Sequence, residues 1–269
     1  MATSRAVKPR RRHGRSDGRD ESKDLEKLQR LLFDGDGRRL LPRQLALDGV
    51  LARLSDEALF RFCETQASGP LYLLPTVEFA RAFGRMVRGL AAPGGTLLEV
   101  AAGDGFLTRS LKQAEPGLRW LASDSGAWED PRARMSRSER RAKPADVSGL
   151  RLGPGVERAE AVAAIRAHQP DVVVACWLPP GKLFERILRA PSRIVIEVGA
   201  GGGVTGQGEW GWRFAHHFAP TAVERLARSR LDAGARRRTQ VTVFFGRRHP
   251  EYREERPRAD DWLRIFKPS

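Results

Sequence analysis

The sequence has 269 residues, of which 48 are Lys or Arg and 33 are Asp or Glu, so its formal charge is +15. With 41% hydrophobic residues, this length predicts one large domain with an extension and a sizeable core. No apolar run reaches the roughly 18 residues that span a bilayer, and Cys63 and Cys176 lie too far apart for a disulfide framework or a zinc motif. We therefore expect a cytoplasmic protein with no membrane partner and no metal site.

The N-terminal segment, residues 1–23, is polar and basic. Such a composition predicts a disordered, solvated tail, which could also bind phosphate groups. The charge elsewhere is less informative, because 41 arginines against 7 lysines are scattered along the whole chain, as a GC-rich coding sequence would produce. The basic residues among the first fifteen are Arg5, Lys8, Arg10, Arg11, Arg12 and Arg15.

Residues 24–92 are predicted to form a helical extension or lid. Their leucines recur at helical spacing, in one stripe over 25–32 and in another over 47–54. Ser55 precedes two acidic residues and is a predicted N-cap for a helix to Phe62, and Thr76 is a predicted cap for a helix over 77–90.

Strands and helices alternate from residue 93 onward. This order predicts an α/β domain over 93–269, a Rossmann-like, doubly wound, mostly parallel sheet with a C-terminal antiparallel strand. The expected helices cover 106–113, 157–168, 182–189 and 220–231. The expected strands cover 96–101, 119–123, 171–177 and 192–198, with a terminal strand pair at 239–245 and 262–266.

A glycine turn follows the first expected strand, in the sequence Glu99-Val-Ala-Ala-Gly-Asp-Gly105. Small residues let the backbone approach a ligand closely, and the helix that follows offers free N–H groups. Asp124 lies 21 residues after Gly103, at the end of the next expected strand, where an acid can hold both ribose hydroxyls. A second glycine-rich segment, 199–203, lies too near the end of the chain for a full nucleotide-binding sheet, so we interpret it as a loop after a late strand.

These motifs resemble those of the class I S-adenosylmethionine-dependent methyltransferases, and the resemblance runs from about Leu71 to the C-terminus. It implies S-adenosylmethionine as the cofactor, with the turn around its methionine part and Asp124 at its ribose. It also places residues 171–180 where the family's fourth strand carries the active-site motif. The cofactor-binding residues that it implies are Glu99, Ala101, Gly103, Asp104, Gly105, Asp124, Ser125 and Cys176.

The sequence departs from the family pattern in three places. Ala101 stands where the first glycine is usual. The acid that would hold the adenine amino group stays open among Asp146, Glu157 and Glu160. Leu178 stands before Pro179-Pro180, where enzymes that methylate the amino groups of adenine or glutamine have Asn or Asp.

Methyl transfer depends mainly on positioning the acceptor, because the sulfonium is already an activated donor. Trp177 is therefore a candidate to stack on a planar substrate. A general base is needed only when the acceptor must lose a proton early. Glu209, and His216 with its neighbour His217, are the candidates for that base.

The sequence therefore predicts an S-adenosylmethionine-dependent methyltransferase that acts on a small-molecule substrate, with a small aromatic or polar metabolite slightly favoured as the acceptor. An RNA or protein acceptor that uses the basic tail, and a non-catalytic binding protein with the same fold, remain alternatives. An NAD-dependent dehydrogenase is disfavoured, because Phe106, Leu107 and Thr108 follow the turn without the third glycine that a dinucleotide requires. The oligomeric state stays open.

Overall fold

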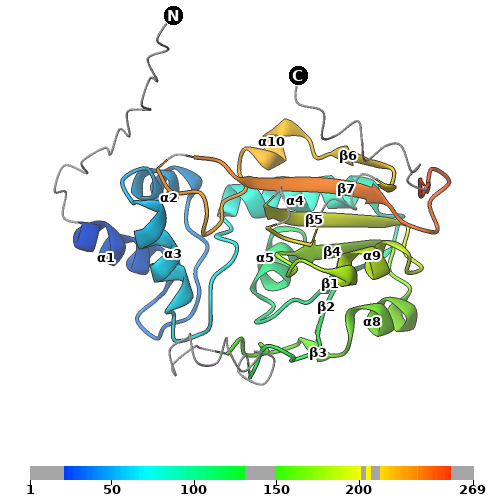
Figure 1. The fold of residues 1–269 in the computed structure, drawn as a ribbon, viewed down its shortest axis with the longest axis horizontal. Coiled ribbons are helices and arrows are strands. Elements are labelled where there is room, and N and C mark those ends of the chain that lie inside the picture. The colour runs from blue at the N-terminus through cyan, green and yellow to red at the C-terminus, as the bar shows by residue number, and fades with distance from the viewer. Residues whose placement is uncertain (1–20, 131–148, 201–203, 207–212, 235, 256–269) are drawn as a thin grey trace, which may run out of the picture.

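The computed structural model describes residues 21–130, 149–200, 204–206, 213–234 and 236–255 (Figure 1). Four helices precede the first strand: α1 (Glu21–Leu32), α2 (Gln44–Leu51), α3 (Asp56–Glu64) and α4 (Val77–Leu90). The elements that follow are β1 (Thr96–Val100), α5 (Phe106–Ala114), β2 (Arg119–Asp124), β3 (Glu157–Arg158), α8 (Ala161–His168), β4 (Val172–Cys176), α9 (Lys182–Leu188), β5 (Ile194–Ala200), β6 (His216–Phe218), α10 (Thr221–Glu224) and β7 (Thr239–Phe245).

The described strands form one seven-stranded sheet in the order β3-β2-β1-β4-β5-β7-β6. β7 runs antiparallel to its neighbours β5 and β6, and the other paired strands are parallel. This order and this single reversed strand confirm the predicted fold class, a Rossmann-like, mostly parallel sheet with an antiparallel strand near the C-terminus. β6 borders β7, whereas the strand expected at 262–266 lies outside the described residues.

Helices cover both faces of the sheet, as a parallel sheet requires. Alternate residues of β4 point to opposite faces, so Val172 and Val174 pack with α4, α5 and α10, while Val173 and Ala175 pack with α8 and α9. The strands are accordingly almost continuous apolar runs. Within the described residues, no helix is both long and apolar enough to span a membrane.

The helices before β1 divide between two cores. α4 contributes Phe79, Phe83 and Val87 to the same core as the sheet. The helices α1, α2 and α3 form a separate core, which Ala233 also joins from the C-terminal half of the chain. The structure thus groups α4 with the sheet, and α1–α3 lie together at one end of the molecule (Figure 1).

The two predicted N-caps are present. The Ser55 hydroxyl accepts a hydrogen bond from the Ala58 N–H at the start of α3. The Thr76 hydroxyl accepts one from the Phe79 N–H at the start of α4. A side-chain oxygen satisfies one of the free N–H groups of a first helical turn, so both residues fix where their helices begin.

Two predicted helices are shorter in the structure because of long-range hydrogen bonds, and the first helix starts earlier than predicted. The helix expected over 157–168 starts only at Ala161, since Glu157 and Arg158 pair with β2 as strand β3. The helix expected over 220–231 ends at Glu224, because the backbone of 228–230 bonds with residues 72–74 instead. α1 begins at Glu21, three residues before the predicted helical extension, and the rest of the predicted tail lies outside the described residues.

Candidate functional site

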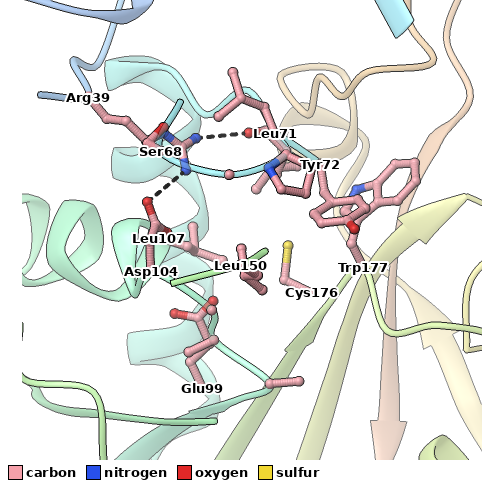
Figure 2. Close-up of a pocket in the computed structure, with 16 residues that line it drawn as sticks. Arg39, Ser68, Leu71, Tyr72, Glu99, Asp104, Leu107, Leu150, Cys176 and Trp177 are labelled. Atoms are coloured by element: carbon pink, nitrogen blue, oxygen red, sulfur yellow. Dashed lines mark hydrogen bonds and ion pairs between the residues drawn. The ribbon is translucent and has the colours of Figure 1, made fainter. Parts of the chain in front are cut away.

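A cavity of about 70 Å³ lies at the carboxyl ends of β1 and β4 (Figure 2). β1 and β4 are adjacent in the sheet, but the chain leaves β1 towards β2 on the other side, so the cavity lies at the point where the strand order reverses. Open α/β sheets bind their ligands at this point. The residues that line it are Arg39, Ser68, Gly69, Pro70, Leu71, Tyr72, Leu73, Glu99, Ala101, Ala102, Gly103, Asp104, Leu107, Leu150, Cys176 and Trp177.

The predicted glycine turn forms one wall of this cavity. Ala101, Gly103 and Gly105 all have positive φ angles, of 53°, 56° and 67°. A Cβ atom at Gly103 would lie 2.8 Å from the Leu150 side chain, and one at Gly105 would lie 2.6 Å from Val156. Glycine is therefore favoured at both positions by the backbone conformation, and a larger residue would also have to displace the Leu150 or Val156 side chain. Ala101 adopts the same conformation with a Cβ, at a cost of about 1 kcal/mol.

Glu99 is a buried acid on β1 that faces the cavity. One of its carboxyl oxygens accepts hydrogen bonds from the Thr108 N–H at 2.9 Å and from the Thr108 hydroxyl at 2.5 Å. Burial raises the pKa of Glu99 to about 7, although the bonds from Thr108 and the nearby Arg109 oppose that rise. A cationic group in the cavity would pair with this carboxylate and favour its ionised form.

Asp124 fixes the glycine turn through a hydrogen bond to its backbone and does not line the cavity. Its two carboxyl oxygens accept the N–H of Gly103 at 2.9 Å and the N–H of Gly126 at 2.8 Å, and its side chain is buried. Neither Asp124 nor the adjacent Ser125 lines the cavity as it stands. The structure therefore shows Asp124 as the residue that orders the turn, and each of its oxygens retains a lone pair for a ligand.

The end of β4 supplies two further predicted residues. The Cys176 thiol lines the cavity, and burial raises its pKa well above the usual value, so it is not a reactive thiolate. Trp177 has a positive φ of 54°, which is uncommon for a bulky residue. Its buried indole N–H has no hydrogen-bond partner among the described residues. Its ring stacks on Tyr72, with 6.1 Å between the ring centroids.

Sequence reasoning missed the residues that cover the cavity from the extension. Segment 68–73 crosses its mouth, and the Arg39 guanidinium donates to the Asp104 carboxylate at 3.3 Å and to the Leu73 carbonyl at 3.2 Å (Figure 2). The same guanidinium lies 3.9 Å from the centroid of the Phe106 ring. No local pattern marks Arg39, because it is one of 41 arginines.

The structure does not bring His216, one of the predicted general bases, to this cavity. His216 lies on β6 opposite Phe244, and Phe244 pairs with Val195 near the start of β5, whereas the cavity lies beyond the carboxyl ends of the strands. The His216 ring bonds to the Phe214 carbonyl at 2.8 Å. Glu209, the other candidate, lies outside the described residues.

The segment after β4 contains Leu178, the residue before Pro179-Pro180. Leu178 is buried and packs with α9 in the core on the other side of the sheet, so its side chain takes no part in the cavity. Its carbonyl accepts the Gly206 N–H at 2.9 Å. Among the described residues, no group of three or more His, Cys, Asp and Glu side chains is placed to hold a metal ion.

No family model matches the chain, and no curated protein matches its sequence. Solved structures are similar in fold. The 23S rRNA methyltransferase ErmE is 16% identical over 63% of this chain and 68% of its own, with a TM-score of 0.31. The carbon methyltransferase CurJ is 13% identical over 84% of this chain and 67% of its own, with a TM-score of 0.40.

A third structure is that of M. capricolum TrmK in complex with the cofactor product S-adenosylhomocysteine. It is 10% identical over 66% of this chain and 72% of its own, with a TM-score of 0.36.

Proposed function

We propose that this chain is an S-adenosylmethionine-dependent methyltransferase with a planar acceptor group. The observation that carries the proposal is the buried Glu99 carboxyl in a cavity at the strand-order reversal, beside a glycine turn that a second acid, Asp124, holds in place. A buried acid without a cationic partner is costly, and a cofactor with an ammonium and a sulfonium group supplies the missing charge.

The residues present fit the methionine end of this cofactor. Glu99 would pair with its ammonium group, and Arg39, which lines the same cavity, would face its carboxylate. The cofactor supplies a methyl group on a positively charged sulfur. The chain's own contribution is to bind and orient the donor and the acceptor, because their proximity and alignment supply most of the rate acceleration in such a transfer.

The acceptor side is formed by Tyr72 and Trp177. Their rings already stack, and the unpartnered indole N–H of Trp177 can donate a hydrogen bond to a heteroatom of a flat acceptor ring. The positive φ of Trp177 is a strained backbone conformation of the kind that is concentrated at functional sites. A small aromatic metabolite and a nucleobase both present such a ring.

The cavity must widen before it can contain the whole cofactor. Its volume of about 70 Å³ is below the roughly 300–1,000 Å³ of ordinary ligand sites. Two groups cover the space beside the turn: the Leu150 side chain over Gly103, and the segment 68–73 over the mouth. We expect the adenosine part to enter by displacing Leu150.

Isothermal titration calorimetry with S-adenosylmethionine, S-adenosylhomocysteine and NAD tests the proposal. We expect heat with both sulfur ligands and none with NAD. Replacing Glu99 by Gln keeps an acceptor for Thr108 but removes the charge, so the affinity for S-adenosylmethionine should fall at least about tenfold, which is about 1.4 kcal/mol. If neither sulfur ligand gives heat, the proposed function is refuted. Binding of S-adenosylmethionine without methyl transfer to any acceptor indicates the non-catalytic alternative.

A further inference from the structure

A second, larger hollow lies beside the cavity, between the extension and the helices α4 and α5. We call it the arginine groove. Its volume is about 700 Å³, ten times that of the cavity described above. Arg39 lines both spaces, so the groove and the cavity are adjacent and share this residue as part of their walls. The described residues that line it are Arg39, Leu40, Leu41, Arg43, Val77, Ala80, Arg81, Phe106, Arg109, Ser110, Gln113 and Ala114.

Four of these residues are arginines, and none of the residues that line the groove in the described part of the chain is acidic. The arginines come from three separate segments: residues 39–43, the start of α4 and the first turns of α5. The fold therefore gathers them, although the sequence gives them no common motif. This placement sets them apart from the many arginines that are scattered over the surface.

The acidic groups that face these arginines do not neutralise them all. Asp104 pairs with Arg39 at 3.3 Å and lies 4.0 Å from Arg109, and Glu78 lies 3.5 Å from the exposed Arg43. Arg81 is exposed and has no acidic partner among the described residues. Two carboxylates thus oppose four guanidinium groups, and the groove keeps an excess of positive charge.

α4 continues the basic lining beyond the groove. Arg85 lies one helical turn after Arg81, on the same face of the helix, and it too is exposed without an acidic partner in the described residues. A single phosphate would occupy only a small part of this space. Several guanidinium groups along one groove offer a separate contact to each of several phosphates of a strand, and guanidinium binds phosphate in a bidentate manner.

We propose that the arginine groove binds the phosphodiester backbone of a single-stranded nucleic acid and so directs one of its bases to the Tyr72–Trp177 side of the cavity. Methylation of that base rests on the proposed function, whereas binding of the strand to the groove does not. This inference moves the preference for the acceptor from a small metabolite to a nucleobase. Arginine contacts to phosphates supply affinity, whereas the cavity selects the base.

Fluorescence anisotropy with a labelled single-stranded RNA of mixed sequence, at increasing KCl, tests the groove. The test protein is the full chain with Arg43→Gln and Arg81→Gln. The matched control is the full chain with Arg166→Gln and Arg186→Gln, two exposed arginines on α8 and α9, which cover the opposite face of the sheet. Both variants lose the same charge, and both keep residues 1–20, so the basic tail contributes equally.

We expect the groove variant to bind RNA about tenfold or more weakly than the wild type, and the control to bind as the wild type does. The slope of log affinity against log salt should fall by about 0.7 for each phosphate contact removed, hence by about 1.4 in the groove variant alone. Equal losses in both variants would mean that net charge drives binding, and wild-type binding by the groove variant would mean that the groove is not used. Either result overturns the proposal.

Competition identifies the chemistry of the ligand. An unlabelled strand should displace the labelled RNA, whereas inorganic phosphate at the same phosphate concentration should not. If phosphate competes as well as the strand does, the groove is a site for small anions and the proposal fails.

Calorimetry with S-adenosylmethionine on the same proteins separates the two proposals. Cofactor binding without groove-dependent RNA binding refutes only the groove. RNA binding that depends on Arg43 and Arg81, without any cofactor binding, refutes only the methyltransferase.

Discussion

Glu99 links the stability of the chain to pH. Burial raises its pKa to about 7 from the model-compound value of 4.5, so the folded chain binds this proton more tightly than the unfolded chain does. The contribution of Glu99 to folding is therefore most favourable below about pH 4.5. It becomes less favourable as the pH rises to about 7, by about 3 kcal/mol in total.

Replacing Glu99 by Gln should remove this pH dependence. The amide oxygen can accept both hydrogen bonds from Thr108, and no charge is buried at high pH. We expect E99Q and the wild type to have similar free energies of unfolding near pH 5, and E99Q to be more stable near pH 8, by an amount approaching 3 kcal/mol. Urea unfolding at both pH values measures the difference, and a less stable E99Q at high pH would contradict the assignment.

Asp124 is expected to stabilise the turn even without a ligand. Its two oxygens accept two backbone N–H groups, and the Asn side chain has only one acceptor oxygen. D124N should therefore leave one buried N–H unpaired and lose about 1–3 kcal/mol of folding free energy in the absence of cofactor. Thermal unfolding of the ligand-free protein measures this loss. Unchanged stability combined with weaker cofactor binding would instead indicate a role confined to the ribose.

For single residues, the sequence predicted which residues form the turn but not which residues they contact. Glu99, Gly103 and Asp104 line the cavity because consecutive residues fix the turn locally. Asp124 was predicted from its spacing, and the structure shows it bonded to the turn. Arg39 and Tyr72 could not be predicted, since their role depends on how the extension folds back over β1 and β4.

Of the two capped helices α3 and α4, α4 has the N-cap with more hydrogen bonds. The Thr76 hydroxyl caps α4 and also donates to the Gln44 side chain of α2 at 2.7 Å, and Thr76 is fully buried. The Ser55 hydroxyl caps α3 at an exposed position. T76A should therefore lower the free energy of unfolding by about 2 kcal/mol, against about 1 kcal/mol for S55A. Chemical denaturation of both variants tests the order, and an equal loss would mean that the bond to Gln44 contributes nothing.

The elements with strong local signals were predicted best. The cap at Thr76 and the apolar spacing after it fix α4 at the predicted bounds of 77–90. The pairing of Glu157 and Arg158 with β2, and the bonds of 228–230 with residues 72–74, are long-range interactions that no local pattern contains. They shorten α8 and α10 because a backbone N–H can serve only one ladder at a time.

In the molecule as a whole, two buried arginines of the C-terminal half form ion pairs with partly exposed carboxylates of the extension. Arg228 is buried and donates to both oxygens of Asp48 on α2, at 2.7 and 3.0 Å. Its guanidinium also donates to two carbonyls of its own segment, those of Arg225 and Ala227. A second arginine, Arg230, pairs with Glu64 at the end of α3. We infer that α1–α3 and the sheet unfold together.

Replacing Arg228 by Met measures how much the ion pair with Asp48 stabilises the chain. Asp48 would lose its bidentate partner while staying partly hydrated, so we expect a loss of about 2 kcal/mol. R236M is the control, because the pair of Arg236 with Asp56 is exposed and should contribute less than about 1 kcal/mol. Residues 21–75 contain no tryptophan. The helix signal in circular dichroism therefore includes the extension directly, whereas tryptophan fluorescence senses it only through Trp177, which stacks on Tyr72. Coincident transitions in the wild type confirm one unit, and separate ones contradict it.

Arg39 lines both the cavity and the arginine groove, so binding of the two proposed ligands would be thermodynamically coupled. A guanidinium that turns towards an anion on one side gives up its contacts with Asp104 and Leu73 on the other. A ligand that moves it therefore changes the affinity for the second ligand, and reciprocity requires the second ligand to change the affinity for the first by the same factor. The final complex is the same whichever ligand is added first. The affinity measured for one ligand then depends on how far the other site is occupied.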